Sequence, residues 1–117
     1  MKPNLILEKS MELALSIVDL YKYLCAEKRE FVISKQLLRS GTSVGANAKE
    51  ASLAQSKRDF VAKLSISLKE AGETEYWLEL LYKSNYITKT QFDNYYNINA
   101  DILRIITAIL KTARNNL

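Results

Sequence analysis

The chain of 117 residues contains no histidine, one cysteine (Cys25), one proline (Pro3) and three glycines. Without histidine it lacks the usual general base near neutral pH and the commonest metal ligand. Catalysis is therefore the weakest class of function, and neither a metal nor another cofactor is expected. A single cysteine excludes an internal disulfide and a thiolate metal cluster, which fits a reducing cytoplasm. So few proline and glycine residues predict long helices with short connections.

Long apolar runs are also missing, since none approaches the roughly 18 residues that a membrane span requires. The first ten residues, MKPNLILEKS, carry Glu8 before any long apolar core, so they do not resemble a signal peptide. We expect a cytoplasmic protein without a membrane partner. Residues 1–117 are expected to form one domain, large enough to bury a core without covalent staples.

Apolar residues recur at spacings of three and four along four segments, which predicts four amphipathic helices. The first helix is expected from Leu5 to about Glu27, and the second from about residue 32 to about residue 54. The buried seam of the first helix is expected to comprise Leu7, Met11, Ala14, Val18, Tyr21 and Cys25.

Capping signals mark the starts of the third and fourth helices. Ser56 is expected to be the N-cap of the third helix, and Thr88 to Gln91 form a capping box for the fourth. Gly72 falls inside the third helix, where it costs about 1 kcal/mol relative to Ala unless close packing requires it. The sequence therefore predicts an all-α fold, an antiparallel up-down-up-down four-helix bundle.

The segment of residues 36–51, QLLRSGTSVGANAKEA, has helical character but consists almost entirely of small and polar residues. On a helical wheel, a polar stripe runs directly beside an apolar one. The members of the polar stripe are Arg39, Ser40, Ser43, Asn47 and Glu50. A solvated face would carry long Lys and Glu side chains instead. We therefore expect this stripe to pack against the core, another subunit or a ligand.

Two interpretations of the polar stripe differ in the role of Arg39. In the structural one, Arg39 forms an ion pair with Glu70 or Glu73 of the third helix, or with Glu50 on its own helix. In the functional one, Arg39 and Asn47 face a ligand. A catalytic cluster of the three glutamates is a weaker alternative.

The net charge of +4 is concentrated in one region of the chain. Residues 31–60 hold five basic and two acidic side chains, which suits an anionic partner. Lys35, Lys49, Lys57 and Arg58 lie outside the polar stripe or at the following turn. They are candidate nucleic-acid-binding residues, although an ordinary solvated face would account for them equally well.

Four stretches resemble the four-helix-bundle family associated with 23S rRNA intervening sequences. In chain order they are KSMELALSIVDLY (9–21), QLLRSGTSVGANAKEAS (36–52), SKRDFVAKLSISLKEAGETEYWLELL (56–81) and SNYIT (84–88). The chain departs from the family at Ala48 and Ala51, where members commonly have Ile and Gly. Some members are labelled ribosomal proteins, and a related branch serves diversity-generating retroelements, binding nucleic acid and a reverse transcriptase.

The resemblance implies assembly into rings, typically homopentamers. A ring would repeat a weak basic patch around its axis into a continuous surface. Trp77 is then expected to be buried between subunits, because interfaces are enriched in Trp. We expect a non-enzymatic, ring-forming bundle whose partner is RNA or DNA. The alternative is a protein-interaction scaffold that binds a protein partner and no nucleic acid.

Overall fold

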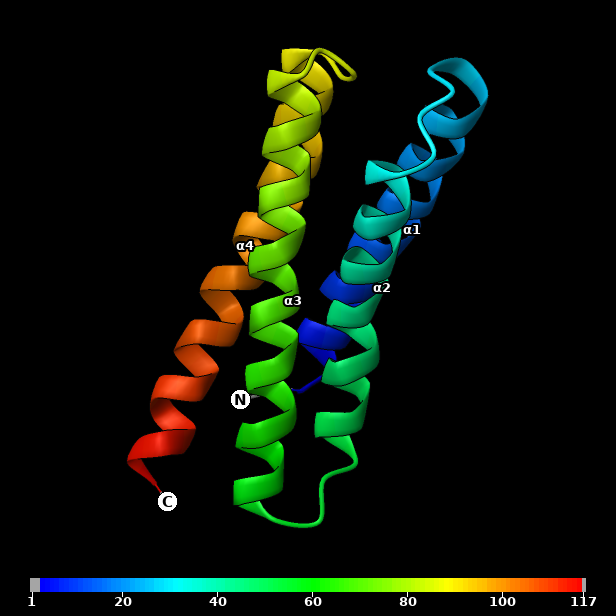
Figure 1. Ribbon diagram of the computed structural model, residues 1–117. Coiled ribbons are helices and arrows are strands. Elements are labelled where there is room, and N and C mark those ends of the chain that lie inside the picture. The colour runs from blue at the N-terminus through cyan, green and yellow to red at the C-terminus, as the bar shows by residue number, and fades with distance from the viewer. Residues whose placement is uncertain (1–2, 117) are drawn as a thin grey trace.

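The computed structural model describes the backbone of residues 3–116 and the side chains of residues 5–116. Four helices account for most of these residues (Figure 1). They are α1 (Pro3–Glu27), α2 (Ile33–Ser52), α3 (Lys57–Lys83) and α4 (Lys89–Asn115). No strand occurs between residues 3 and 116. The all-α class and the four predicted helices are confirmed.

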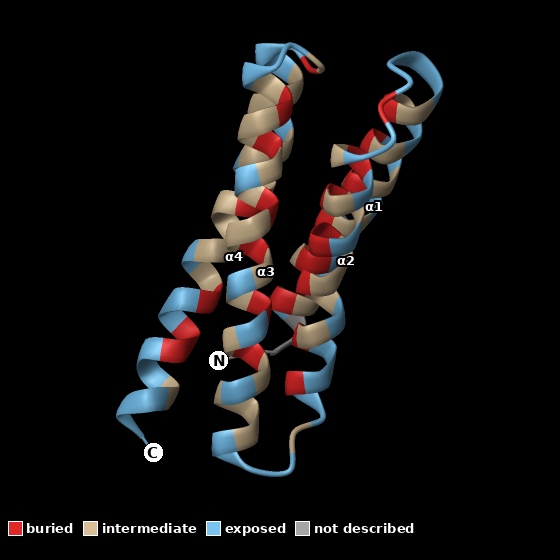
Figure 2. Cartoon of the chain, in the orientation of Figure 1, coloured by how far each residue is buried: buried red, intermediate tan, exposed pale blue. Residues whose placement is uncertain are grey.

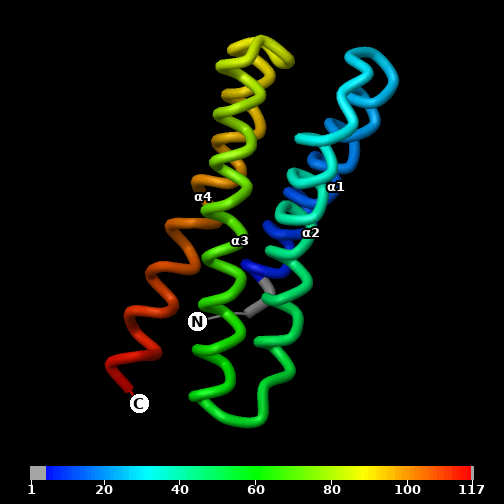
Figure 3. Tube along the Cα trace, in the orientation of Figure 1, coloured from blue at the N-terminus to red at the C-terminus, as the bar shows by residue number. Residues whose placement is uncertain are grey.

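The four helices lie side by side in an elongated molecule of 46 × 20 × 19 Å. Helix α1 packs against α2 and α4, and α3 packs against the same two helices. The α1–α2 and α3–α4 connections lie at one end of the molecule, and the α2–α3 connection lies at the other (Figure 3). This arrangement is consistent with a four-helix bundle. Within residues 3–116, no helix combines the length and the apolar character that crossing a membrane requires.

The starts of α3 and α4 follow the predicted capping signals. Ser56 Oγ accepts a hydrogen bond from the backbone N–H of Asp59 at 3.0 Å. Thr88 and Gln91 exchange two bonds, one at 3.2 Å from the Gln91 N–H to Thr88 Oγ1 and one at 2.8 Å from the Thr88 N–H to Gln91 Oε1. Both helix starts are therefore fixed locally, by residues within one turn.

Helix α2 begins with a cap that the sequence did not indicate, the buried side chain of Glu30. Its carboxylate accepts backbone N–H bonds from Val32 at 3.1 Å, Ile33 at 2.9 Å and Ser34 at 2.7 Å. Burial by itself would raise the pKa of Glu30, but these N–H donors outweigh it, so the pKa lies below its usual value. Glu30 thus supplies the acceptors that the first turn of α2 lacks.

Replacing Glu30 with Gln should lower the free energy of unfolding by about 1.5 kcal/mol, because the N–H groups of Val32, Ile33 and Ser34 lose a charged acceptor. Since the pKa is lower in the folded state, this contribution is present above the unfolded-state pKa and disappears as pH falls through the folded-state pKa. Urea unfolding of the wild type and Glu30→Gln at about pH 7 and about pH 3 measures this. Exposed Glu27 gives the control, Glu27→Gln. A Glu30→Gln loss that is the same at both pH values would contradict the charged-cap explanation.

The core lies between the four helices, where buried positions face one another (Figure 2). In α1 the predicted seam is wrong by one position, because Met11 is 61% exposed. The residues of α1 that form the hydrophobic core are Ile6, Leu13, Ile17, Leu20 and Leu24. The apolar faces of α2, α3 and α4 also contribute to the core. Their fully or nearly fully buried members are Leu37, Val44, Ala48, Ala51, Leu64, Ala71, Leu78, Ile102, Ile106 and Ile109.

Candidate functional site

The inner edge of the polar stripe lies between α2 and α3. Ser40 is fully buried, and its Oγ accepts a hydrogen bond from Thr74 Oγ1 of α3 at 3.0 Å. One turn further along α2, Ser67 Oγ of α3 donates to the backbone carbonyl of Val44 at 2.6 Å. Small side chains let the two helices approach closely enough for these bonds. The inner edge of the stripe therefore packs against the protein's own core, which is one of the three partners considered for it.

The outer edge of the stripe is bonded to its own helix. Ser43 Oγ donates to the carbonyl of Arg39 at 2.6 Å, and Asn47 Nδ2 donates to the carbonyl of Ser43 at 2.8 Å. Both are local bonds between a side chain and the preceding turn of the helix. One of the two amide N–H donors of Asn47 is thus already engaged within α2.

Arg39 joins α2 to α3 through Glu73. Its Nη2 lies 3.9 Å from Glu73 Oε2, and the same oxygen accepts a hydrogen bond from Trp77 Nε1 at 3.0 Å. The expected pairing of Arg39 with a glutamate of the third helix is confirmed, and the partner is Glu73. Trp77 is half-buried against the protein's own core. Glu70 contributes its backbone carbonyl, which lies 2.8 Å from Thr74 Oγ1 and is a second acceptor for the same hydroxyl proton.

The expected pairing of Arg39 with Glu50 is wrong. Glu50 pairs with Lys63 of α3, at 3.3 Å between Nζ and Oε1. Arg39 and Glu50 share a sector of α2, but eleven residues place them about 16 Å apart along the helix axis. Glu50 and Glu73 therefore meet different cations at different levels of the bundle. Within the part of the chain that the structure describes, no group of three or more His, Cys, Asp or Glu side chains could hold a metal ion.

The four candidate nucleic-acid-binding residues, Lys35, Lys49, Lys57 and Arg58, are all exposed. None of them forms an ion pair with any residue that the structure describes. Six other cations do pair with carboxylates, namely Lys9, Arg39, Lys63, Lys83, Lys89 and Arg104. The four candidates therefore present positive charge that no described carboxylate neutralises by direct contact.

Three of these four cations flank the α2–α3 connection. Lys49 lies in the last turn of α2, and Lys57 and Arg58 lie in the first turn of α3. Lys35 stands apart, because fourteen residues of α2 separate it from Lys49 by about 21 Å. The sequence grouped all four by charge, and the structure brings only three of them to the same end.

The position of Lys57 and Arg58 is not explained by helix stability. The N-terminus of a helix carries partial positive charge, so cations in its first turn are unfavourable by about 0.3–1 kcal/mol each. Asp59, the acidic residue of this turn, offsets part of that repulsion.

Helix α4 ends at the same end of the molecule as the α2–α3 connection (Figure 1). Arg114, in its last turn, donates from Nη2 to Ser65 Oγ of α3 at 3.0 Å. The sequence did not single out Arg114. The sequence does show an excess of basic residues after residue 88. That excess could be assigned to this end of the molecule only once the end of α4 was seen to lie beside α3.

Comparison with known proteins shows similarity over nearly the whole chain. The model of the family described as 23S rRNA-intervening sequence protein matches residues 2–108. A crystal structure of a protein with unknown function from the S23 ribosomal protein family of Bacteroides thetaiotaomicron VPI-5482 is 54% identical. It covers 95% of this chain and 99% of its own, with a TM-score of 0.93. No curated protein matches.

Proposed function

The chain belongs to the 23S rRNA-intervening sequence protein family, and from this membership we propose that it is a non-enzymatic, oligomeric protein that binds RNA or DNA through a basic surface. The proposal places it in the cytoplasm, with helices in antiparallel up-down-up-down order. The alternation of the helix connections between the two ends of the molecule supports that order (Figure 3).

The observation that carries the nucleic-acid part is the set of unpaired cations at the α2–α3 connection. Lys49, Lys57 and Arg58 are exposed, and no described carboxylate contacts them. Phosphates of RNA or DNA would supply the missing negative charge, releasing condensed counterions as they bind. Binding of this kind depends on charge and shape, so it distinguishes only weakly between base sequences.

Oligomerisation is the second part of the proposal. A homopentameric ring would bring five copies of the α2–α3 connection onto one assembly and multiply a modest charge cluster. Large apolar side chains exposed on α1 support assembly, because Met11 is 61% exposed and Leu15 is 62% exposed.

Binding of a single-stranded RNA as a function of salt tests the nucleic-acid part. We expect log K to fall by about 0.7 per phosphate contact against log salt. The double variant Lys57→Ala/Arg58→Ala should weaken binding. It should also make the salt dependence less steep, by the equivalent of about one to two phosphate contacts. Fluorescence anisotropy at a series of salt concentrations measures both quantities.

The matched control removes two positive charges from the opposite end of the molecule. Lys83→Ala/Lys89→Ala changes the net charge equally, but both lysines are already paired, with Glu79 and Asp93. Affinity and salt slope should stay close to those of the wild type. Equal losses of affinity in the two double variants would show that the α2–α3 connection is not the binding surface. Absence of binding at low salt would reject the nucleic-acid function.

A protein-interaction scaffold is the second candidate function. The apolar face of α1 favours it, because exposed apolar patches mark protein contacts more often than nucleic-acid contacts. Absence of RNA and DNA binding, together with a stable assembly in solution, would favour this candidate.

A further inference from the structure

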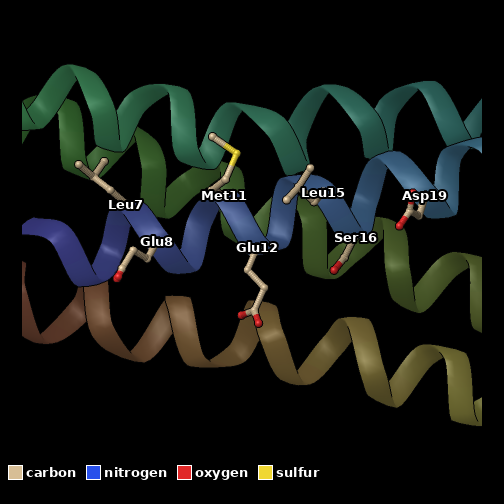
Figure 4. A pocket seen from close by; sticks show the side chains of 7 residues that line it. All are labelled: Leu7, Glu8, Met11, Glu12, Leu15, Ser16 and Asp19. Atoms are coloured by element: carbon tan, nitrogen blue, oxygen red, sulfur yellow. The ribbon is translucent and has the colours of Figure 1, made fainter.

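Helix α1 carries an apolar ridge on the side that faces away from the core. Met11 and Leu15 lie along it, and with Leu7, which is partly buried against the core, they line a shallow surface groove of about 620 Å³. Met11 and Leu15 are each more than 60% exposed. In Figure 4 these three side chains project from one edge of α1. Met11 and Leu15 are thus large apolar groups that the chain itself leaves in contact with water.

The other edge of the same groove is acidic. Glu8, Glu12 and Asp19 line it, and the side chains of Glu8 and Glu12 project away from the apolar ridge (Figure 4). Glu12 has a cation of its own helix nearby, with its Oε1 3.9 Å from Lys9 Nζ. Glu8 and Asp19 form no ion pair with a described residue. The ridge therefore has negative charge along one side.

A second groove continues the apolar surface from α1 onto α2. It measures about 400 Å³ and shares Leu7 and Met11 with the first groove. On the α2 side it is lined by Thr42, Gly45, Ala46 and, at its end, Lys49. A Cβ at Gly45 would lie 3.2 Å from Ser10 Oγ of α1, so the two helices are close together here. Small side chains on α2 leave Met11 projecting beyond its neighbours.

Helix α4 carries a groove of the opposite charge. Leu103, Thr107 and Ala108 line a groove of about 360 Å³ together with Arg104 and Lys111. Arg104 pairs with Asp101 of its own helix. Lys111 is exposed and forms no ion pair with a described residue. This surface offers a shallow apolar strip bordered by positive charge.

We propose that the Met11–Leu15 ridge of α1 docks into the Leu103–Ala108 groove of α4 on a second copy of this chain. The acidic edge of the ridge then meets the basic border of the groove. In a two-fold antiparallel pairing of two α1 ridges, by contrast, the two acidic edges would face each other and repel. Charge complementarity thus selects α4 over a second α1 as the partner surface.

Such a contact is head to tail, because it uses two different surfaces of each chain. A docked pair keeps one free groove, on the chain whose ridge is used, and one free ridge, on the other chain, so contacts continue until a ring closes. This inference rests on the oligomeric part of the proposed function, and it names the two surfaces that meet.

Two single variants and their mixture test the pairing. Met11→Glu places a charge in the ridge, and Ala108→Glu places one in the groove; both positions are exposed, so circular dichroism should match the wild type. Light scattering over a concentration series should give an oligomeric mass for the wild type and the single-chain mass for each variant alone. An equimolar mixture should form a 1:1 dimer, because the intact groove of Met11→Glu receives the intact ridge of Ala108→Glu.

Val32→Glu is the control, since Val32 is 72% exposed and lies at the α1–α2 connection, outside both surfaces. It should keep the wild-type mass. A single-chain mass for the wild type, an unchanged mass for Ala108→Glu, or a mixture that stays at the single-chain mass would each overturn the pairing. RNA binding measured on the same samples is a separate readout. Its absence alongside the predicted masses would reject the nucleic-acid function and leave the pairing intact.

Discussion

Replacing Gly41 with Ala should destabilise the protein by about 2 kcal/mol, even though Ala is the better helix former. Gly41 is buried on α2 where α1 crosses closely. A Cβ there would lie 2.8 Å from Ile17 Cγ1, 2.9 Å from Ile17 Cγ2 and 3.2 Å from Ile17 Cβ. Ile17 is fully buried and branched at Cβ, so it cannot turn away at low cost. The helices must separate instead, which opens the surrounding core.

Gly72→Ala is the matched control, and it should change stability in the opposite direction. Apart from its chain neighbours and the backbone of its own helix turn, no atom lies within 4 Å of the position that a Cβ at Gly72 would occupy. The substitution therefore keeps only the gain in helix propensity, up to about 1 kcal/mol. Urea unfolding of both variants measures the difference. Two shifts of the same sign would show that helix propensity, and not the contact with Ile17, governs both positions.

Features that depend on a few neighbouring residues could be predicted from the sequence. The caps at Ser56 and Thr88 involve residues three positions apart, so local spacing was sufficient. The cap of α2 was missed because Glu30 is an unusual capping residue and stands in the charged run EKRE of residues 27–30, which contains no capping motif. Its function depends on the carboxylate turning back under the first turn, which sequence spacing does not encode.

The candidate site was predictable in composition but not in grouping. The sequence indicated which cations lie off the apolar faces, and Lys35 and Lys57 are indeed exposed. It could not show that they lie near opposite ends of the molecule. The sequence could not decide between Glu50 and Glu73 as the partner of Arg39 for a similar reason. A helical wheel gives the direction of a side chain and discards its height along the axis.

The first helix shows why a correct helix can have an incorrect core face. Apolar residues cover more than half of its circumference, so two neighbouring stripes both satisfy the helical period. One contains Leu13 and the other contains Met11. Only the partners of α1 decide between them, and α2 and α4 cover the stripe of Leu13.

Leu13→Ala should therefore destabilise the protein by about 3 kcal/mol, whereas Met11→Ala should change the stability of a single chain by less than about 0.5 kcal/mol. Leu13 is fully buried, so its truncation removes apolar contacts and leaves a cavity. Met11 is mostly exposed, and its truncation leaves the core unchanged. Urea unfolding of the two variants compares the two stripes directly.

Protein concentration separates the core from the assembly in this comparison. An oligomer gains stability by mass action, so a residue at its interface contributes more as concentration rises. The loss in Leu13→Ala should be the same at low and high concentration, because it arises within each chain. Any loss in Met11→Ala should grow with concentration if the ridge is buried between copies. A large, concentration-independent loss in Met11→Ala would instead place this residue in the core and return α1 to the seam that its sequence first indicated.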